Sequence, residues 1–135
     1  MTAALSLPLQ AAIFARLQGD AALSALVGPH VLDALPPGPP PPLYVALGPE
    51  TVRDRSDGTG QGAEHDLVVS IVTDGAGFAG AKAAAGAVSD ALVGADLALS
   101  RGHLVFLRFL RGQAVRSGAN RRIDLTFRAR VEDAD

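Results

Sequence analysis

Cysteine is absent from the sequence, and aromatic residues make up only 4% of it. Without cysteine the chain can form neither disulfides nor thiolate-ligated zinc and iron–sulfur sites. Because hydrophobic residues still reach 48%, we expect a core packed mainly from Ala, Val, Leu and Ile. The length of 135 residues predicts a single domain that spans residues 1–135.

Long apolar runs are also missing, and none approaches the roughly 20 residues that span a bilayer. The first cationic side chain is Arg16, so the basic start of a signal peptide is absent as well. We therefore expect a soluble protein, made in the cytoplasm, without a membrane partner. The net charge of -2 disfavours free-standing nucleic-acid binding, although eight of the twelve cationic residues lie from Arg101 onward.

The first third of the chain predicts two helices followed by a spacer. Ser6 is a plausible N-cap of the first helix, and Asp20 can cap a second helix that ends at Gly28. A short strand is expected near Val31. Residues 36–42 hold six of the nine prolines, which favours an extended connection.

The middle of the chain alternates between strand and helix patterns. Residues 43–54 predict a strand interrupted at Gly48–Pro49, and residues 55–62 an exposed, mobile loop. Residues 67–71 predict a second strand, and apolar residues spaced by three and four predict a helix over 78–92.

Two further strands close the sequence. Residues 103–111 are apolar on both faces near their middle, which predicts a central strand, and residues 122–131 alternate cleanly between apolar and polar. Residues 112–120 should join them as a hairpin connection. The predicted fold is α+β: a mostly antiparallel sheet of about four to five strands, with helices on one face.

One short motif is typical of an enzyme. Residues 75–80 spell a literal GxGxxG between a strand and a helix, with Asp96 about twenty residues further on. A dinucleotide site also requires a parallel βαβ unit, which the predicted element order does not supply. We interpret the motif as a strand-to-helix turn and predict no enzymatic activity and no cofactor. A small nucleotide-binding enzyme is the alternative.

Metal binding is not predicted either. Glu64, His65 and Asp66 are consecutive, so along a strand their side chains point to alternate faces and cannot complete one coordination shell. His30 and His103 are isolated.

Charged residues beside the predicted loop at 55–62 and in the final third of the chain are our candidates for contacts between subunits or for the lining of a lumen. Arginine rather than lysine is the cation favoured at interfaces, and only Lys82 is lysine. The candidate residues are Arg53, Asp54, Arg55, Arg108, Arg116, Arg121, Arg122 and Arg128.

Taken together, five segments resemble the tail-terminator, or tail-completion, proteins of tailed phages and gene transfer agents. They are LQAAIFARLQGDAALSALVGPHVLDALP (9–36), PLYVALGPETVRD (42–54), GAEHDLVVSIVTDGAGFAGAKAAAGAVSDAL (62–92), LALSRGHLVFLRF (97–109) and RRIDLTFRARVE (121–132). The resemblance covers nearly the whole chain. The proline run is longer, and the turn at 75–80 richer in glycine, than is usual in the family.

The resemblance implies a structural protein without catalytic residues. Such a protein forms a homo-oligomeric ring, usually of six copies, that caps the head-proximal end of the tail tube and stops its growth. Its partners are the tail tube protein and a neck or stopper protein, and DNA crosses the lumen without sequence-specific binding. It assembles in the cytoplasm of the bacterial host and ends at the head–tail junction. Another head–tail connector subunit is the alternative.

Overall fold

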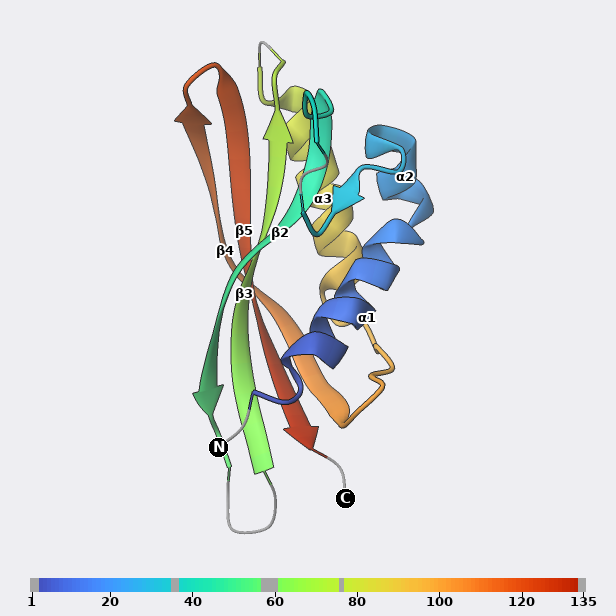
Figure 1. Cartoon of the computed structure of the whole chain (residues 1–135), viewed down its shortest axis with the longest axis vertical. Helices are drawn as coiled ribbons and strands as arrows, with labels where there is room; N and C mark the ends of the chain where they lie inside the picture. The colour runs from blue at the N-terminus through green and yellow to red at the C-terminus, as the bar shows by residue number, and fades with distance from the viewer. Residues whose placement is uncertain (1–2, 35–36, 57–60, 76, 134–135) are drawn as a thin grey trace.

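The structure is a computed structural model that describes residues 3–34, 37–56, 61–75 and 77–133. Three helices cover one face of a five-stranded sheet, so the predicted α+β class is confirmed (Figure 1). The elements are α1 (Ser6–Gln18), α2 (Ala21–Val27), β1 (Val31–Leu32), β2 (Leu43–Asp54), β3 (Gln61–Thr73), α3 (Ala79–Leu92), β4 (His103–Ser117) and β5 (Asn120–Asp133).

The strand order is β1-β2-β3-β5-β4, and only β1 and β2 run parallel. Strand β3 pairs antiparallel with both β2 and β5. The GxGxxG segment follows β3, whose two neighbours in the sheet are both antiparallel to it, so no parallel strand pairs beside it as a dinucleotide site requires. It forms the turn into α3, as predicted, although Ala76 lies outside the described residues.

Strand β4 was predicted to be central, and this prediction was wrong, because β4 lies at the edge of the sheet. Its apolar residues on both faces had suggested burial on both sides. Leu107 is indeed 2% exposed, but Val105 and Phe109 are 49% and 44% exposed. Phe109 is held at the edge by a T-shaped contact with the buried ring of Phe127, with 5.8 Å between centroids.

The connection between β4 and β5 is also shorter than predicted. Strand β4 continues to Ser117, and the hairpin turns at Gly118, whose φ is +61°. A register shift between Phe109 and Arg111 explains the error, because the extra residue interrupts the alternation that identifies a strand.

The two N-terminal helices pack an apolar stripe against the sheet. Leu9, Ile13 and Leu17 of α1 are buried, and the backbone N–H of Leu23 donates to the side chain of Asp20, which confirms the predicted cap of α2. Ser6 does not cap α1. It is the first helical residue, and its hydroxyl donates to Glu50 Oε1 at 2.9 Å.

Strand β5 supplies the centre of the core. Its inward residues were predicted correctly, and each is at most 5% exposed: Ile123, Leu125, Phe127, Ala129 and Val131. Buried alanines of α3 allow this helix to approach the sheet closely. In β2, the predicted interruption at Gly48–Pro49 is a register shift between Leu47 and Glu50, after which pairing with β3 resumes.

Gly102 is predicted to be far less replaceable than other turn glycines. Its φ is +70°, and an added Cβ would lie 2.6 Å from the Glu132 carbonyl oxygen and 2.9 Å from the Leu5 methyls. Gly118 has φ +61° but open space around it. Gly118→Ala should cost about 1–2 kcal/mol of unfolding free energy through φ alone. Gly102→Ala should cost at least about 1 kcal/mol more. Urea unfolding measures both, and equal losses would contradict the packing of the α1 start against β5.

Candidate assembly surface on the open face of the sheet

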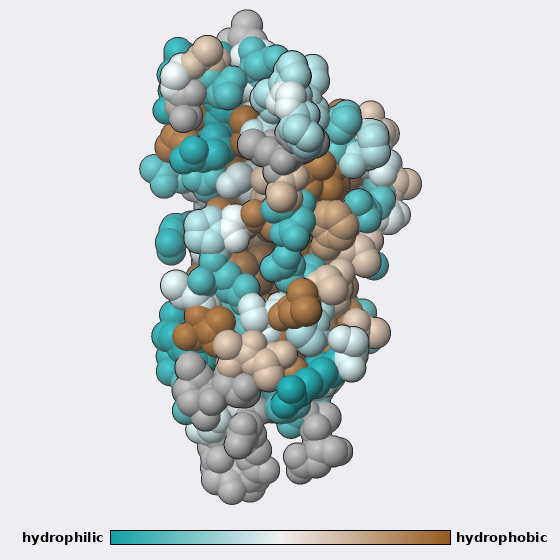
Figure 2. Space-filling model, viewed as in Figure 1, coloured by the Kyte–Doolittle hydropathy of each residue, from teal (hydrophilic) through white to brown (hydrophobic). Residues whose placement is uncertain are grey.

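The helices leave one face of the sheet uncovered, and this open face is charged. Among the described residues it carries seven arginines and four carboxylates. The arginines are Arg53, Arg55, Arg108, Arg111, Arg122, Arg128 and Arg130, and the carboxylates are Glu64, Asp66, Asp124 and Glu132. The space-filling view shows one side of the molecule, on which teal hydrophilic residues are interspersed with brown apolar ones (Figure 2).

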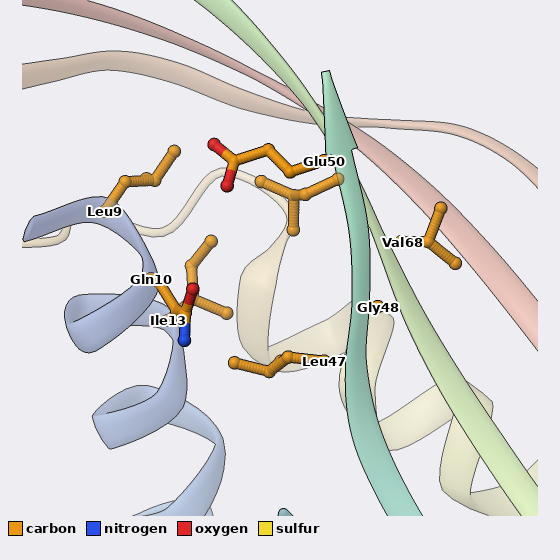
Figure 3. A pocket seen from close by; sticks show the side chains of 8 residues that line it. Leu9, Gln10, Ile13, Leu47, Gly48, Glu50 and Val68 are labelled. Carbon is orange, nitrogen blue, oxygen red and sulfur yellow. The ribbon is translucent and has the colours of Figure 1, made fainter. Parts of the chain in front are cut away.

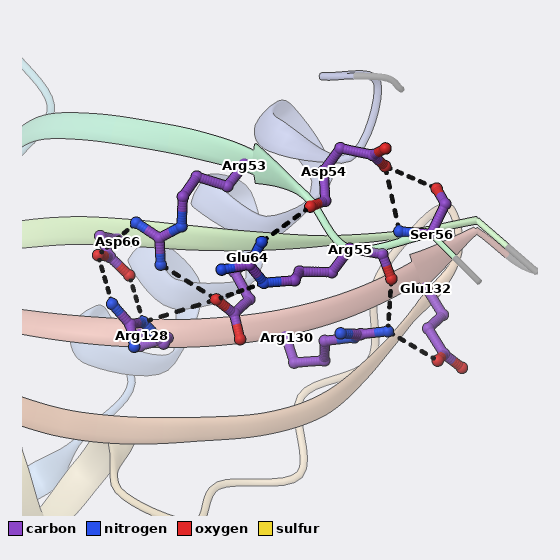
Figure 4. Close-up of polar contacts among 9 residues, drawn as sticks. All are labelled: Arg53, Asp54, Arg55, Ser56, Glu64, Asp66, Arg128, Arg130 and Glu132. Carbon is purple, nitrogen blue, oxygen red and sulfur yellow. Dashed lines mark hydrogen bonds and ion pairs between the residues drawn. The ribbon is translucent and has the colours of Figure 1, made fainter.

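A continuous charge network crosses three strands on this face. Arg53 of β2 donates to Glu64 at 3.0 Å and to Asp66 at 3.2 Å, both on β3. Arg128 of β5 donates two hydrogen bonds, of 2.8 and 3.0 Å, to the Asp66 carboxylate from the other side (Figure 4). Because the two-bond geometry fixes both planar groups, the network resists sliding of one strand against the next.

The network continues toward the end of the sheet. Arg55 Nε lies 3.3 Å from Glu64 Oε1, and Arg130 donates to the Arg55 carbonyl at 2.8 Å and reaches Glu132 at 3.7 Å (Figure 4). Asp54 accepts from the hydroxyl and N–H of Ser56 and contributes no cross-strand ion pair among the described residues. The predicted mobile loop at 55–62 lies partly outside the described residues, since 57–60 are among those not described.

Hydrogen bonding favours the charged form of these groups. The bonds from Arg128, and then from Arg53, hold the pKa of Asp66 below its usual range, although partial burial opposes them. The bond from Arg53 likewise lowers the pKa of Glu64. The same bonds raise the pKa values of Arg53 and Arg128, so all four groups are ionised at neutral pH.

Some of the predicted site residues form ion pairs with carboxylates of the sheet, and others do not. Arg53, Arg55 and Arg128 are committed to the network, and Arg122 pairs with Asp124 at 2.9 Å. The structure places the others apart from this network. Arg108 lies over the Phe106 ring at 3.8 Å, Arg116 is exposed at the end of β4, and Arg121 donates to the Gly75 carbonyl near the start of α3.

Glu64, Asp66 and Arg130 belong to the network but were not predicted as site residues. The signal was available, because the alternation of β3 places Glu64 and Asp66 on one face and His65 on the other. The same alternation excludes a shared metal shell for the three. No metal-like group of three or more His, Asp or Glu side chains occurs in the part of the chain that is described.

His65 lies on the helix side and is fully buried. Its Nδ1 contacts Glu50 Oε2, and Glu50 also accepts from Ser6 of α1, whereas Nε2 has no hydrogen-bond partner among the described atoms. Glu50 therefore ties the start of α1 to the sheet beside a small apolar crevice that also includes Leu9 and Leu47 (Figure 3). We interpret this as structural, because it anchors a helix end.

The described helices include none with the length and hydrophobicity needed to cross a membrane.

Comparison with known proteins defines the class. The family model described as "Tail completion protein gp17" matches residues 11–132. The chain belongs to this family and is a structural protein of a phage-like tail.

A solved structure gives a more particular relation. A chain of "Virion of native gene transfer agent (GTA) particle" is 62% identical, with a TM-score of 0.92 over 97% of this chain and 99% of that chain. No match was found among curated proteins.

Loss of one network carboxylate should change the pH dependence of stability. A carboxylate whose pKa is lowered by folding stabilises the protein above its unfolded pKa of about 4, and this stabilisation is lost as pH falls through the folded pKa. Asp66→Asn should therefore cost about 1 kcal/mol at pH 7 and flatten the fall of Tm with acidification. Asp90→Asn on the exposed surface of α3 is the control. Parallel curves for the wild type and Asp66→Asn would contradict the role of the network.

Proposed function

We propose that the chain is a non-catalytic subunit of a ring, most simply of six copies, that ends the tail tube at its head-proximal side. The ring stops addition of tube subunits and presents its other surface to a neck or stopper protein. Membership of the tail completion family is the observation that carries this proposal, and the GTA virion match supports it. One domain over residues 1–135 would form each subunit.

The mechanism requires geometry and mass action rather than turnover. A closed ring needs two different complementary patches on each subunit, so that each copy binds its neighbours head to tail. Six simultaneous contacts with the tube end then strengthen binding without a tight single contact. Growth stops because the far surface of the ring does not reproduce the surface to which tube subunits add.

The open face is the surface that we assign to this assembly. Its arginines outnumber its carboxylates although the whole chain carries a net charge of -2. A face of this kind suits a lumen through which DNA passes. Its arginines attract the phosphates of the DNA backbone, and such contacts do not depend on the base sequence. Because Arg53, Arg55 and Arg128 hold the sheet together, Arg108 is the better placed arginine of this face to meet partners. Arg116 is also exposed, but it lies on the helix side at the end of β4, in the row of Arg121.

The second candidate is another connector subunit of the neck, which the family description does not distinguish from a terminator. The two roles differ in the particle defect that loss of the protein produces. Loss of a terminator leaves tubes without a defined length, whereas loss of a stopper leaves tubes of normal length that fail to join heads.

Deletion of the gene is therefore expected to give tubes of uncontrolled length in electron micrographs of the resulting particles. Wild-type protein supplied in trans should restore joined particles. The double variant Arg108→Glu and Arg116→Glu should fold but lower particle yield at least tenfold, because both side chains are exposed and no carboxylate pairs with either in the described structure.

Lys82→Glu on α3 is the matched charge reversal and should restore normal yield. Normal, joined particles after deletion would exclude both the terminator and the connector. Full complementation by the arginine double variant would exclude these two residues from assembly while leaving the terminator role intact.

A further inference from the structure

Within the described parts of the chain, the sheet has two free edges, and they are different. One is the second half of β2, residues 50–54, because β1 covers only Val45 and Ala46. The other is the outer edge of β4 beyond Leu107, whose carbonyl accepts from Gly94 N–H at 3.2 Å. Further along β4, no backbone bond to the outer edge occurs among the described residues. Such edges are open to pairing with another strand.

The backbone geometry determines which residues point outward. In an antiparallel ladder every second residue turns its N–H and C=O away from its partner. The Leu107 carbonyl points outward, and the register shift after Phe109 moves this set to Gly112, Ala114 and Arg116. On β2 the Val45 N–H points outward to the His30 carbonyl. After the register shift before Glu50, the outward set is Glu50, Val52 and Asp54.

The strand directions of the two edges are compatible. Strands β2, β3, β5 and β4 are each antiparallel to the next, so β4 and β2 run in opposite directions. Neighbours in a ring are related by rotation about one axis. Placing β4 of one copy beside β2 of the next therefore creates an antiparallel pair, with helix side meeting helix side.

The register is inferred from the rows of the sheet together with the stagger that closed barrels show. Ala114 shares a row with Ile71 through Ile123, whereas Glu50 pairs with Leu67, four residues away along β3. Joining Ala114 to Glu50 thus needs a stagger of about one residue for each of the four long strands, as in closed barrels whose strands tilt by roughly 36°. Gln113 then lies opposite Thr51, and both are exposed and uncharged.

We propose that the free edge of β4, from Gly112 to Ala114, pairs antiparallel with residues 50–52 of β2 in a second copy of this chain. This inference rests on the proposed ring and assigns its head-to-tail interface. The open faces of neighbouring copies then join into one charged surface around the lumen. The arginines of β4 and its register shift limit pairing with other, unmatched strands.

The chain has no cysteine, so introduced thiols report the contact directly. The double variant Thr51→Cys and Gln113→Cys is assembled into particles, and oxidised samples are compared by non-reducing gel electrophoresis. The expected result is a ladder of covalent oligomers that stops at the ring number. The control pair Ala15→Cys and Ala83→Cys, exposed on α1 and α3, should remain monomeric.

Each single variant alone should stay monomeric, because each seam then contains one thiol. If the double variant does not assemble, the two single-cysteine chains are mixed instead and co-expressed with wild-type chain, which secures assembly. This mixture should give dimers. Dimers from Gln113→Cys alone would indicate β4–β4 pairing and overturn the proposal. Joined particles without cross-links, from both the double variant and the mixture, would also overturn it. A missing ladder together with uncontrolled tubes after deletion would leave the terminator role standing. A ladder together with normal particles after deletion would instead reject that role.

Discussion

The pairing of β3 with β5 is the constraint on which the rest of the structure depends. The two strands pair along the whole of β3, from Gln61 to Thr73, and they alternate in phase. Residues such as Val69 and Phe127 turn to the helices and are fully buried, while Asp66 and Arg128 meet on the opposite face. A slip of one residue would place charges in the core and apolar residues in water. One register therefore creates both the core and the charged surface.

The two faces stabilise that register in different ways. The core contributes apolar burial, with Phe127 at its centre and the alanines of α3 close to the sheet. The open face contributes directional ion pairs that are already ionised at neutral pH. A surface made rigid in this way can meet a partner without first becoming ordered, which lowers the entropic cost of assembly.

Local sequence patterns predicted the helices and strands themselves better than they predicted which elements lie side by side. The apolar spacing of Leu9, Ile13 and Leu17 and the cap at Asp20 depend on adjacent residues, and the structure confirms both. The edge position of β4 could not be predicted in this way, since burial on both faces and a bulge give similar sequence patterns. The sequence revealed only part of the charge network, because three of its arginines were selected but Arg130 was not. Glu64 and Asp66 were assigned no role until strand pairing placed them beside Arg53 and Arg128.

A localised reconstruction of the head–tail junction in particles, with this chain carrying a small visible tag, tests the proposed role most directly. The proposal predicts one closed ring of this chain between the last tube ring and the neck, with six copies as the family resemblance implies. Tag density along the tube, at the distal tip, or in the neck beyond an already closed tube end would contradict the terminator role.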